Sequence, residues 1–407
     1  MTEQHQKDYA RLRELGKKYA EIANRDENLK LIENYKNLNN LKAARPLIKA
    51  EEVPWHEMNV NDELTSQISD PFLKEFETLL LRAIYQNKHM SGDSVYQPWL
   101  VTQRAVKISS FGLDVDEETL SIDDQNAVVS HSYKNLINST EDAMKITKPT
   151  ITEDVAETNR RFEIASEIFD GILDVRSERP TIYAALWDDI AMWMGVENLL
   201  MALITEPDLM HLVIDRYSSA MAEHLKDLEK MDMLYFGTTV HTSYNYLPEM
   251  QAGPQSLDKV WLHSAAQIFG STSKEMHKEF EFDYIGRLYE LVGYGHYGCC
   301  EPLHGRLDLV RAIPNIRKIS CSPWCDMQIA ADEIRGDYAV SFKPNPSYLA
   351  GTSVNWEVVE DEVSRAFESC RKNNTPMEII LKDISTVNYK PERLWEWVSR
   401  VSAIVGK

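Results

Sequence analysis

The segment His296-Tyr-Gly-Cys-Cys-Glu301 brings together an imidazole, two thiols and a carboxyl within six residues. These are the side chain types that bind metals, move protons and attack electrophiles. We expect the segment to close a strand over residues 293–300. Along a strand, alternate side chains point to opposite faces, so His296 and Cys300 should share one face, and Tyr297 and Cys299 the other.

The cysteines of the chain are unevenly spread, because four of the five lie between residues 299 and 325. Clustered thiols in a chain without an export signal favour metal or redox chemistry over a disulfide scaffold. Zinc prefers thiolate and imidazole ligands and, in enzymes, keeps one position open for substrate. The alternative is that the cysteines pack as small hydrophobic side chains and the histidine bonds a carbonyl. The predicted zinc ligands are His296, Cys299, Cys300, Glu301 and Cys321.

Other reactive residues follow predicted strands, at the end where enzymes built from parallel βα units place their sites. The candidates for proton transfer or substrate orientation are His263, His241 and Asp188. The candidates for substrate binding are Trp187, Tyr297, Trp324 and Asn345. Each kind has a structural alternative. An aspartate could cap a helix, His263 could bond a loop carbonyl, and the tryptophans could pack at the core edge.

The elements that must position these residues alternate along the chain from about residue 180. Short strands separated by long helices are typical of repeated βα units on a parallel sheet, and with one earlier strand they predict an α/β fold, a (β/α)8 TIM barrel. The predicted strands cover residues 45–50, 181–187, 233–239, 259–264, 293–300, 317–323, 338–344 and 377–384. The predicted helices include residues 188–203, 208–230, 273–291, 326–334 and 357–372.

The remaining segments are assigned around that barrel. Residues 1–42 are predicted as an N-terminal helical cap, because Leu12, Leu15, Tyr19 and Ile22 form one apolar stripe at helical spacing. Residues 60–178 are too long for one βα unit and are predicted as a mainly helical insertion over the barrel mouth, with a hairpin near residues 106–113. Without a linker or repeat, residues 1–407 are predicted as one domain, with the main barrel over 180–407.

Charge and hydropathy exclude several classes of function. The 407 residues contain 44 Lys and Arg against 64 Asp and Glu, a net charge of -20 that repels nucleic acid. The apolar runs are too short for a bilayer, and the first residues lack a signal peptide, so we expect a cytoplasmic protein without a membrane partner. Dinucleotide-binding, Walker A, nucleophile-elbow and zincin motifs are absent.

Several motifs together resemble the uroporphyrinogen decarboxylase-like superfamily. They are Met194-Gly-Val-Glu-Asn-Leu-Leu, Thr205-Glu-Pro-Asp, Ser271-Thr-Ser-Lys-Glu-Met-His-Lys-Glu-Phe280, Cys299-Cys300, Asn345-Pro and Leu349-Ala-Gly-Thr352. The resemblance runs from about Thr181 to the end of the chain and implies a (β/α)8 barrel with its site at the carboxyl ends of the strands. The Arg-rich N-terminal signature of true decarboxylases is missing, since the region around Arg45 offers a single arginine.

The chain is more similar to the corrinoid-dependent methyltransferase branch, of the methyltransferase I type. That resemblance implies zinc, a corrinoid protein as partner, and methyl transfer from an aryl methyl ether, a methylamine or a similar donor, as in an O-demethylase. The clean His-x-Cys strand end of that branch and its later cysteine are not present, so Glu301, Asp383 or His263 would substitute. A decarboxylase or other lyase and a noncatalytic small-molecule-binding barrel are the alternatives. A homodimer is an open possibility for the helical exterior.

Overall fold

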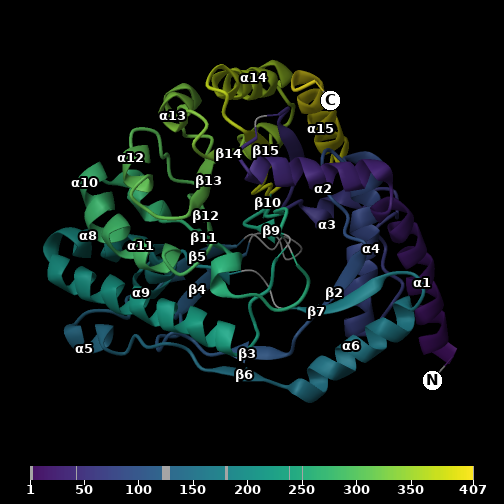
Figure 1. Ribbon diagram of the computed structural model, residues 1–407, viewed down its shortest axis with the longest axis horizontal. Helices are drawn as coiled ribbons and strands as arrows, with labels where there is room; N and C mark the ends of the chain where they lie inside the picture. Colours follow the sequence, from purple (N-terminus) through teal and green to yellow (C-terminus); the bar gives the residue numbers. More distant parts are fainter. Residues whose placement is uncertain are drawn as a thin grey trace.

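The computed structural model describes residues 3–42, 44–121, 129–178, 182–237, 239–249 and 251–406. At its centre lies a seven-stranded sheet in which every neighbouring pair of strands is parallel (Figure 1). The strand order is β1-β15-β14-β13-β12-β11-β8. The bounds are β1 Leu47–Ala50, β8 Ile182–Tyr183, β11 Trp261–Ser264, β12 Tyr294–Tyr297, β13 Ile316–Cys321, β14 Ala339–Phe342 and β15 Met377–Leu381.

Seven of the eight predicted strands form this sheet, most of them shorter than predicted; Thr181, in the second, lies outside the described residues. The predicted strand over 233–239 is not part of it in the described chain, where Tyr235 makes only an isolated bridge to Pro254. A short antiparallel hairpin, β9 Thr239–Val240 and β10 Ser243–Tyr244, follows and contacts β11. The mixed α/β class is confirmed. Closure into an eight-stranded barrel is not, because β1 and β8 are edge strands among the described residues.

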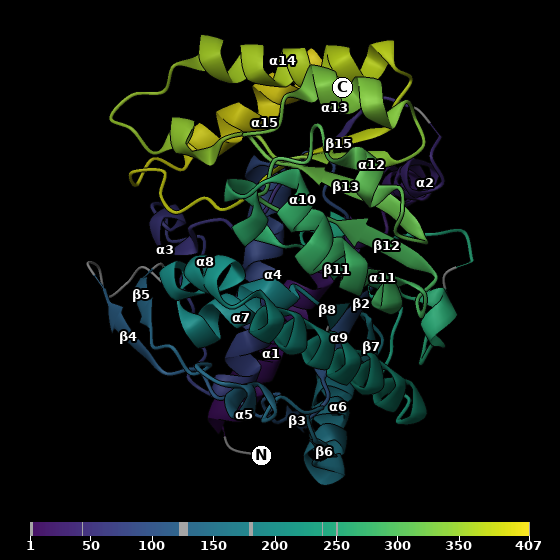
Figure 2. The same ribbon diagram turned by 90° about the vertical axis from the view of Figure 1, so that its left-hand side faces the viewer.

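Helices cover the outside of the sheet in chain order, as Figures 1 and 2 show from two sides. The predicted helix over 188–203 is broken in two, because Gly195 has a φ of +76° that a continuous helix cannot contain. No helix in the described part of the chain has the length and apolar character needed to cross a bilayer. The bounds are α7 Leu186–Met194, α8 Val196–Thr205, α9 Pro207–Lys230, α10 Lys274–His277, α11 Asp283–Tyr289, α12 Leu307–Val310, α13 Met327–Ile334, α14 Trp356–Lys372 and α15 Glu392–Ile404; single turns are η1 Leu257–Lys259, η2 Gln267–Ser271, η3 Lys278–Phe282 and η4 Pro346–Leu349.

The N-terminal cap is helical, as predicted. Helices α1 Glu3–Ala23 and α2 Asp26–Asn39 are joined by a short turn, and α1 packs on α4 Pro71–His89 and α6 Val155–Phe169. The predicted apolar stripe of α1 is buried in a separate hydrophobic cluster with residues of α4 and α6. The cap therefore carries its own small core beside the main one.

The insertion is less helical than predicted. The expected hairpin near residues 106–113 is wrong, because the first strand of that segment pairs with a strand more than 40 residues later. Its elements are α3 Trp55–Met58, α4, β2 Trp99–Gln103, β3 Val106–Ile108, β4 Glu117–Leu120, β5 Ser130–Tyr133, α5 Thr140–Ala143, β6 Ile151–Glu153, α6 and β7 Asp174–Glu178. They pair as β2–β7, β3–β6 and β4–β5. The single domain and the cover over the barrel mouth stay predictions.

The inner face of the sheet is polar rather than purely apolar. Lys318 Nζ lies 3.1 Å from Glu378 Oε1, and both side chains are buried. Ser243 in β10 also donates to this carboxylate, and Lys49 Nζ lies 2.7 Å from Glu51 Oε1. Buried charges require such partners, because an unpaired ion loses its hydration without compensation.

Candidate functional site

Three imidazole rings form a row at the carboxyl ends of β11 and β12. His263 and His296 are register partners on these strands, and their ring centroids are 4.7 Å apart. His241, in the turn between β9 and β10, stacks on His263 at 4.4 Å. His263 Nε2 donates to the carbonyl oxygen of Gly298 at 3.0 Å, the bond given above as its structural alternative. Burial lowers the pKa of His263 to about 3 and lowers the pKa of the other two rings, so the row is neutral near pH 7.

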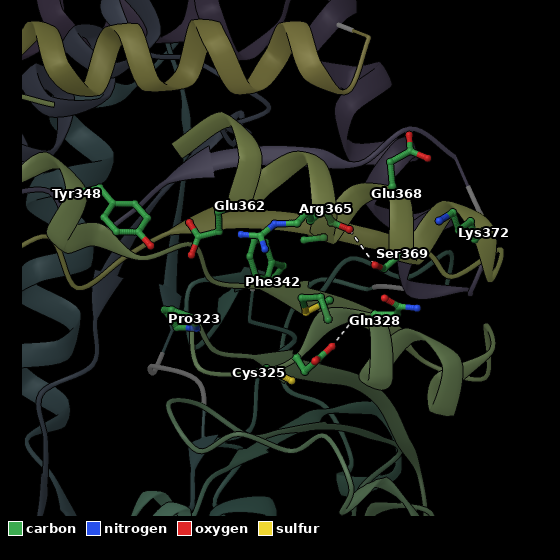
Figure 3. Close-up of a pocket in the computed structure, with 13 residues that line it drawn as sticks. Pro323, Cys325, Gln328, Phe342, Tyr348, Glu362, Arg365, Glu368, Ser369 and Lys372 are labelled. Carbon is green, nitrogen blue, oxygen red and sulfur yellow. Dashed lines mark hydrogen bonds between the residues drawn. The ribbon is translucent and has the colours of Figure 1, made fainter. Parts of the chain in front are cut away.

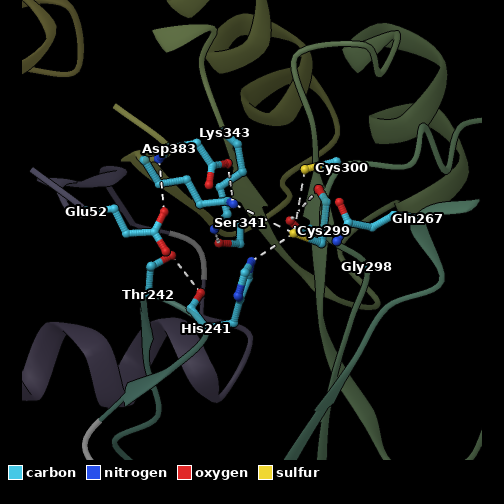
Figure 4. Close-up of polar contacts among 12 residues, drawn as sticks. Glu52, His241, Thr242, Gln267, Gly298, Cys299, Cys300, Ser341, Lys343 and Asp383 are labelled. Atoms are coloured by element: carbon cyan, nitrogen blue, oxygen red, sulfur yellow. Dashed lines mark hydrogen bonds and ion pairs between the residues drawn. The ribbon is translucent and has the colours of Figure 1, made fainter. Parts of the chain in front are cut away.

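The thiol of Cys299 lies at the His241 end of this row, and Figure 4 shows its contact with His241. Its Sγ is 3.0 Å from His241 Nε2 and 3.7 Å from Cys300 Sγ. Lys382 Nζ lies 3.7 Å from the same sulfur. The hydrogen bond with Cys300 and burial both raise the pKa of Cys299, while the pKa of Cys300 is lowered, so Cys300 ionises first. The site therefore offers one protonated and one more acidic thiol.

Gly298 turns the chain so that Cys299 reaches the imidazole row. Its φ of +94° is one that residues with a Cβ rarely adopt, and a Cβ there would lie 2.7 Å from Leu303 Cδ1. Strand β12 ends at Tyr297, so the predicted alternation does not continue to the cysteines. Tyr297 instead points away from the row, where its hydroxyl lies 3.2 Å from His277 Nε2.

Lys382, which follows β15, lies near the Cys299 thiol and near two carboxylates, those of Asp383 and Glu52. Its Nζ lies 2.5 Å from Asp383 Oδ2, and the Asp383 amide donates to Glu52 Oε2 at 2.9 Å. Burial by itself lowers the pKa of Lys382, but its interaction with Cys299, the hydrogen bond and charge of Asp383, and the charge of Glu52 hold it above its usual value. Lys382 is therefore a permanent cation at the site.

Lys343, which follows β14, is a buried lysine of the opposite character. Its Nζ lies 2.5 Å from Ser341 Oγ, and it makes no salt bridge with any residue that the structure describes. Burial lowers the pKa of Lys343 to about 7; the negative charge of Glu378 opposes this shift, and the positive charges of Lys382 and Lys318 add to it. Lys343 therefore exchanges its proton near neutral pH.

Glu301 braces the Cys299 loop. Its carboxylate accepts from the backbone amides of Ala266 at 3.1 Å and Cys299 at 3.0 Å. Burial raises the pKa of Glu301 to about 7. With both oxygens held by the backbone, this side chain orients the loop.

The two aspartates of α7 are not helix caps, because the helix begins before them at Leu186. Asp188 accepts from Gln267 Nε2 at 2.7 Å and lies 3.5 Å from the Tyr183 hydroxyl. Asp189 accepts from Tyr217 at 2.5 Å, and burial raises the pKa of Asp189 to about 6. Asp188 therefore borders the site through Tyr183, whose ring lies 4.9 Å from that of His263.

Three further predicted substrate residues, Trp187, Trp324 and Asn345, lie outside the imidazole row. Trp187 is fully buried and donates to the carbonyl oxygen of Phe280 at 3.1 Å. Trp324 is 68% exposed. Asn345 caps a short turn by accepting from the Ser347 amide at 3.0 Å. None of these interactions involves the imidazole row.

The predicted zinc ligands do not converge. In the part of the chain that the structure describes, no group of three or more His, Cys, Asp or Glu is placed to hold a metal ion. Cys321 lies on the face of β13 opposite Lys318, where its free thiol interacts with that of Cys325. The Lys382 ammonium beside Cys299 also repels a second cation. The residues as they lie do not fit zinc. Zinc binding therefore stays a prediction from the sequence alone.

The sequence motifs gave no role to three residues of the candidate site: Lys343, Lys382 and Glu52. The available signal was position, because both lysines directly follow apolar strands, at the edge where the other reactive residues gather. Burying a lysine there costs free energy, so its presence at a strand end indicates a functional site.

No protein-family model and no curated protein matches the sequence. The chain is similar in fold to a methyltransferase from Methanosarcina mazei. The two structures superpose with a TM-score of 0.51 and 10% sequence identity, over 92% of this chain and 98% of the other. At this identity the likeness shows the fold alone.

Proposed function

We propose that this chain transfers a methyl group from a small methylated substrate, an aryl methyl ether, a methylamine or a similar donor, to the Co(I) corrinoid of a partner protein. The observation that carries the proposal is the pair of buried lysines beside Cys299, on a fold shared with a methyltransferase. Zinc or a proton donor could activate the leaving group in such a reaction, and the lysines support the proton donor.

The chemistry needs a proton where the methyl group departs. When an ether is demethylated, the methyl–oxygen bond breaks, its electron pair stays on oxygen, and a proton must neutralise the developing charge. The corrinoid supplies the nucleophile that takes the methyl group. Lys343 Nζ holds a proton that it can release near neutral pH, since its pKa is about 7. Lys382 remains charged and stabilises the negative oxygen.

The outer end of the neutral imidazole row, at His241 and Tyr183, supplies the surface for the substrate. Tyr183 is 45% exposed and extends the row toward solvent, with its ring 5.9 Å from that of His241. A flat ring can stack on such a surface without meeting a charge. This favours an aryl methyl ether over an aliphatic amine. In this proposal Tyr183, rather than Trp187 or Trp324, is the aromatic side chain that contacts the substrate.

The test uses the purified chain, chemically reduced cobalamin and 2-methoxyphenol, and follows the loss of Co(I) absorbance. The wild type should accelerate the reaction over buffer, and Lys343→Met should lower the rate by about 10²–10⁴-fold, the usual contribution of a proton donor. Lys230→Met is the matched control, because that side chain is 74% exposed and should leave the rate unchanged. A wild type no faster than buffer with both aryl ethers and methylamines would refute the proposal.

A carboxy-lyase is the second candidate, and one observation favours it. Lys343 makes no direct salt bridge with a described residue, and a substrate carboxylate would add one to the longer-range attraction of Glu378. Release of CO2 from a porphyrinogen, with no methyl transfer, would support this reading. Binding of either substrate without turnover would support a noncatalytic barrel.

A further inference from the structure

A second pair of thiols, those of Cys321 and Cys325, lies outside the candidate site, with Cys321 on the face of β13 opposite Lys318. Cys321 ends β13, and Cys325 follows after a turn in which the Cys325 amide donates to the Ser322 carbonyl at 3.0 Å. The turn brings the two thiols close enough to interact with each other. Both are free thiols, and Cys370 of α14 lies near them. Two neighbouring thiols four residues apart are placed to form a disulfide on oxidation.

The surroundings favour Cys325 as the more reactive partner. It directly precedes Asp326, the N-cap of α13, so it lies beside the positive end of that helix. His304 is half-buried, its Nδ1 accepts from the Asp326 amide at 3.1 Å, and it also hydrogen-bonds the Cys325 thiol. Cys370 lies instead within helix α14 and is buried in the core.

Cys325 also lines a cavity of about 490 Å³ between α13 and α14 (Figure 3). The α14 wall carries both signs of charge, with Glu362 and Glu368 beside Arg365 and Lys372. A volume of this size admits a small molecule. A wall of mixed charge suits a zwitterionic peptide that bears both ammonium and carboxylate groups.

We propose that Cys325 is a thiol–disulfide exchange site for a low-molecular-weight peptide disulfide, with Cys321 as the resolving thiol. The Cys325 thiolate attacks one sulfur of the disulfide, the sulfur–sulfur bond of the reagent breaks, and the first thiolate leaves and takes a proton from solvent. Cys321 then attacks the Cys325 sulfur and gives its proton to the second departing thiolate. The protein loses two electrons and gains a Cys321–Cys325 disulfide, and the reagent becomes two thiols.

This proposal does not depend on methyl transfer, because Cys299 and Cys300 belong to the candidate site and do not line the cavity beside Cys325. The experiment treats the folded full-length chain with oxidised glutathione, quenches with acid, alkylates the remaining thiols and maps the peptides by mass spectrometry. The wild type should carry a Cys321–Cys325 disulfide. Cys321→Ser should instead retain glutathione on Cys325, because the resolving thiol is gone.

Cys370→Ser is the matched control and should still form the disulfide. Should Cys321→Ser not fold, short incubations of the wild type should show glutathione on Cys325 before the disulfide appears. Glutathione found on Cys299 or Cys300, with Cys321 and Cys325 still open to alkylation after unfolding, would overturn the proposal.

Discussion

Replacing the buried Lys343 should make the protein more stable at neutral pH. Burial depresses the pKa of Lys343 from 10.5 to about 7. Between these two pH values the unfolded chain binds a proton that the native chain lacks, so the stability contributed by this site rises with pH across the window. At pH 7 and below, the depressed pKa costs roughly 4–5 kcal/mol of unfolding free energy.

The assay is urea unfolding of wild type and Lys343→Met, followed by tryptophan fluorescence at several pH values. Methionine fills a similar volume without the charge, so the variant should exceed the wild type by about 4 kcal/mol at pH 7 and by about 2 kcal/mol at pH 9. A fixed packing difference would shift both values equally, so the decrease is the diagnostic quantity. Lys230→Met should show no such trend. A stability difference that is the same at pH 7 and pH 9 would refute the depressed pKa of Lys343.

Three further predictions concern other parts of the molecule. Gly298→Ala should cost about 1–3 kcal/mol in thermal unfolding because of its positive φ, whereas Gly286→Ala, on a helix with open space around it, should be neutral or slightly stabilising. Trp187→Ala should cost about 3–5 kcal/mol in chemical unfolding and Trp324→Ala within about 0.5 kcal/mol; equal losses would contradict their burial. Elemental analysis should find no stoichiometric zinc, because the Lys382 ammonium borders the thiols; one zinc per chain that Cys300→Ser removes would show that the cluster rearranges around a metal.

The parallel strands were predictable from sequence because each is a short segment rich in apolar, aromatic or β-branched residues that alternates with a longer helical segment. Ile379-Ile380-Leu381 in β15 is an example, buried on both faces as the parallel arrangement requires. The same reasoning failed at residues 233–239, where an equally apolar run does not enter the sheet. Local hydrophobicity does not distinguish a strand of the central sheet from an apolar loop packed beside it, because the difference lies in pairing partners distant in sequence.

Sequence reasoning placed candidate residues at the ends of the strands but did not anticipate which side chains meet. Cys299 and His263 were predicted at the ends of successive strands, and the structure pairs these strands and bonds His263 to the Gly298 carbonyl. The contact of Cys299 with His241 depends on two separate turns, one at His241 and one at Gly298, in which these residues have positive φ, and residue periodicity does not anticipate such turns. Lys382 reaches the same sulfur from 83 residues away. Long-range contacts of this kind follow from topology, which the sequence pattern does not encode locally.

The ion pair between Lys318 and Glu378 restricts how this chain can diverge. Removing either partner alone leaves a buried charge uncompensated, at a cost of about 3–5 kcal/mol, while replacing both with apolar residues of similar volume can be neutral. A lineage that loses one partner thus passes through a destabilised intermediate unless the second change arrives first or together. These two positions should therefore vary as a pair among related chains, although 60 residues separate them in the sequence.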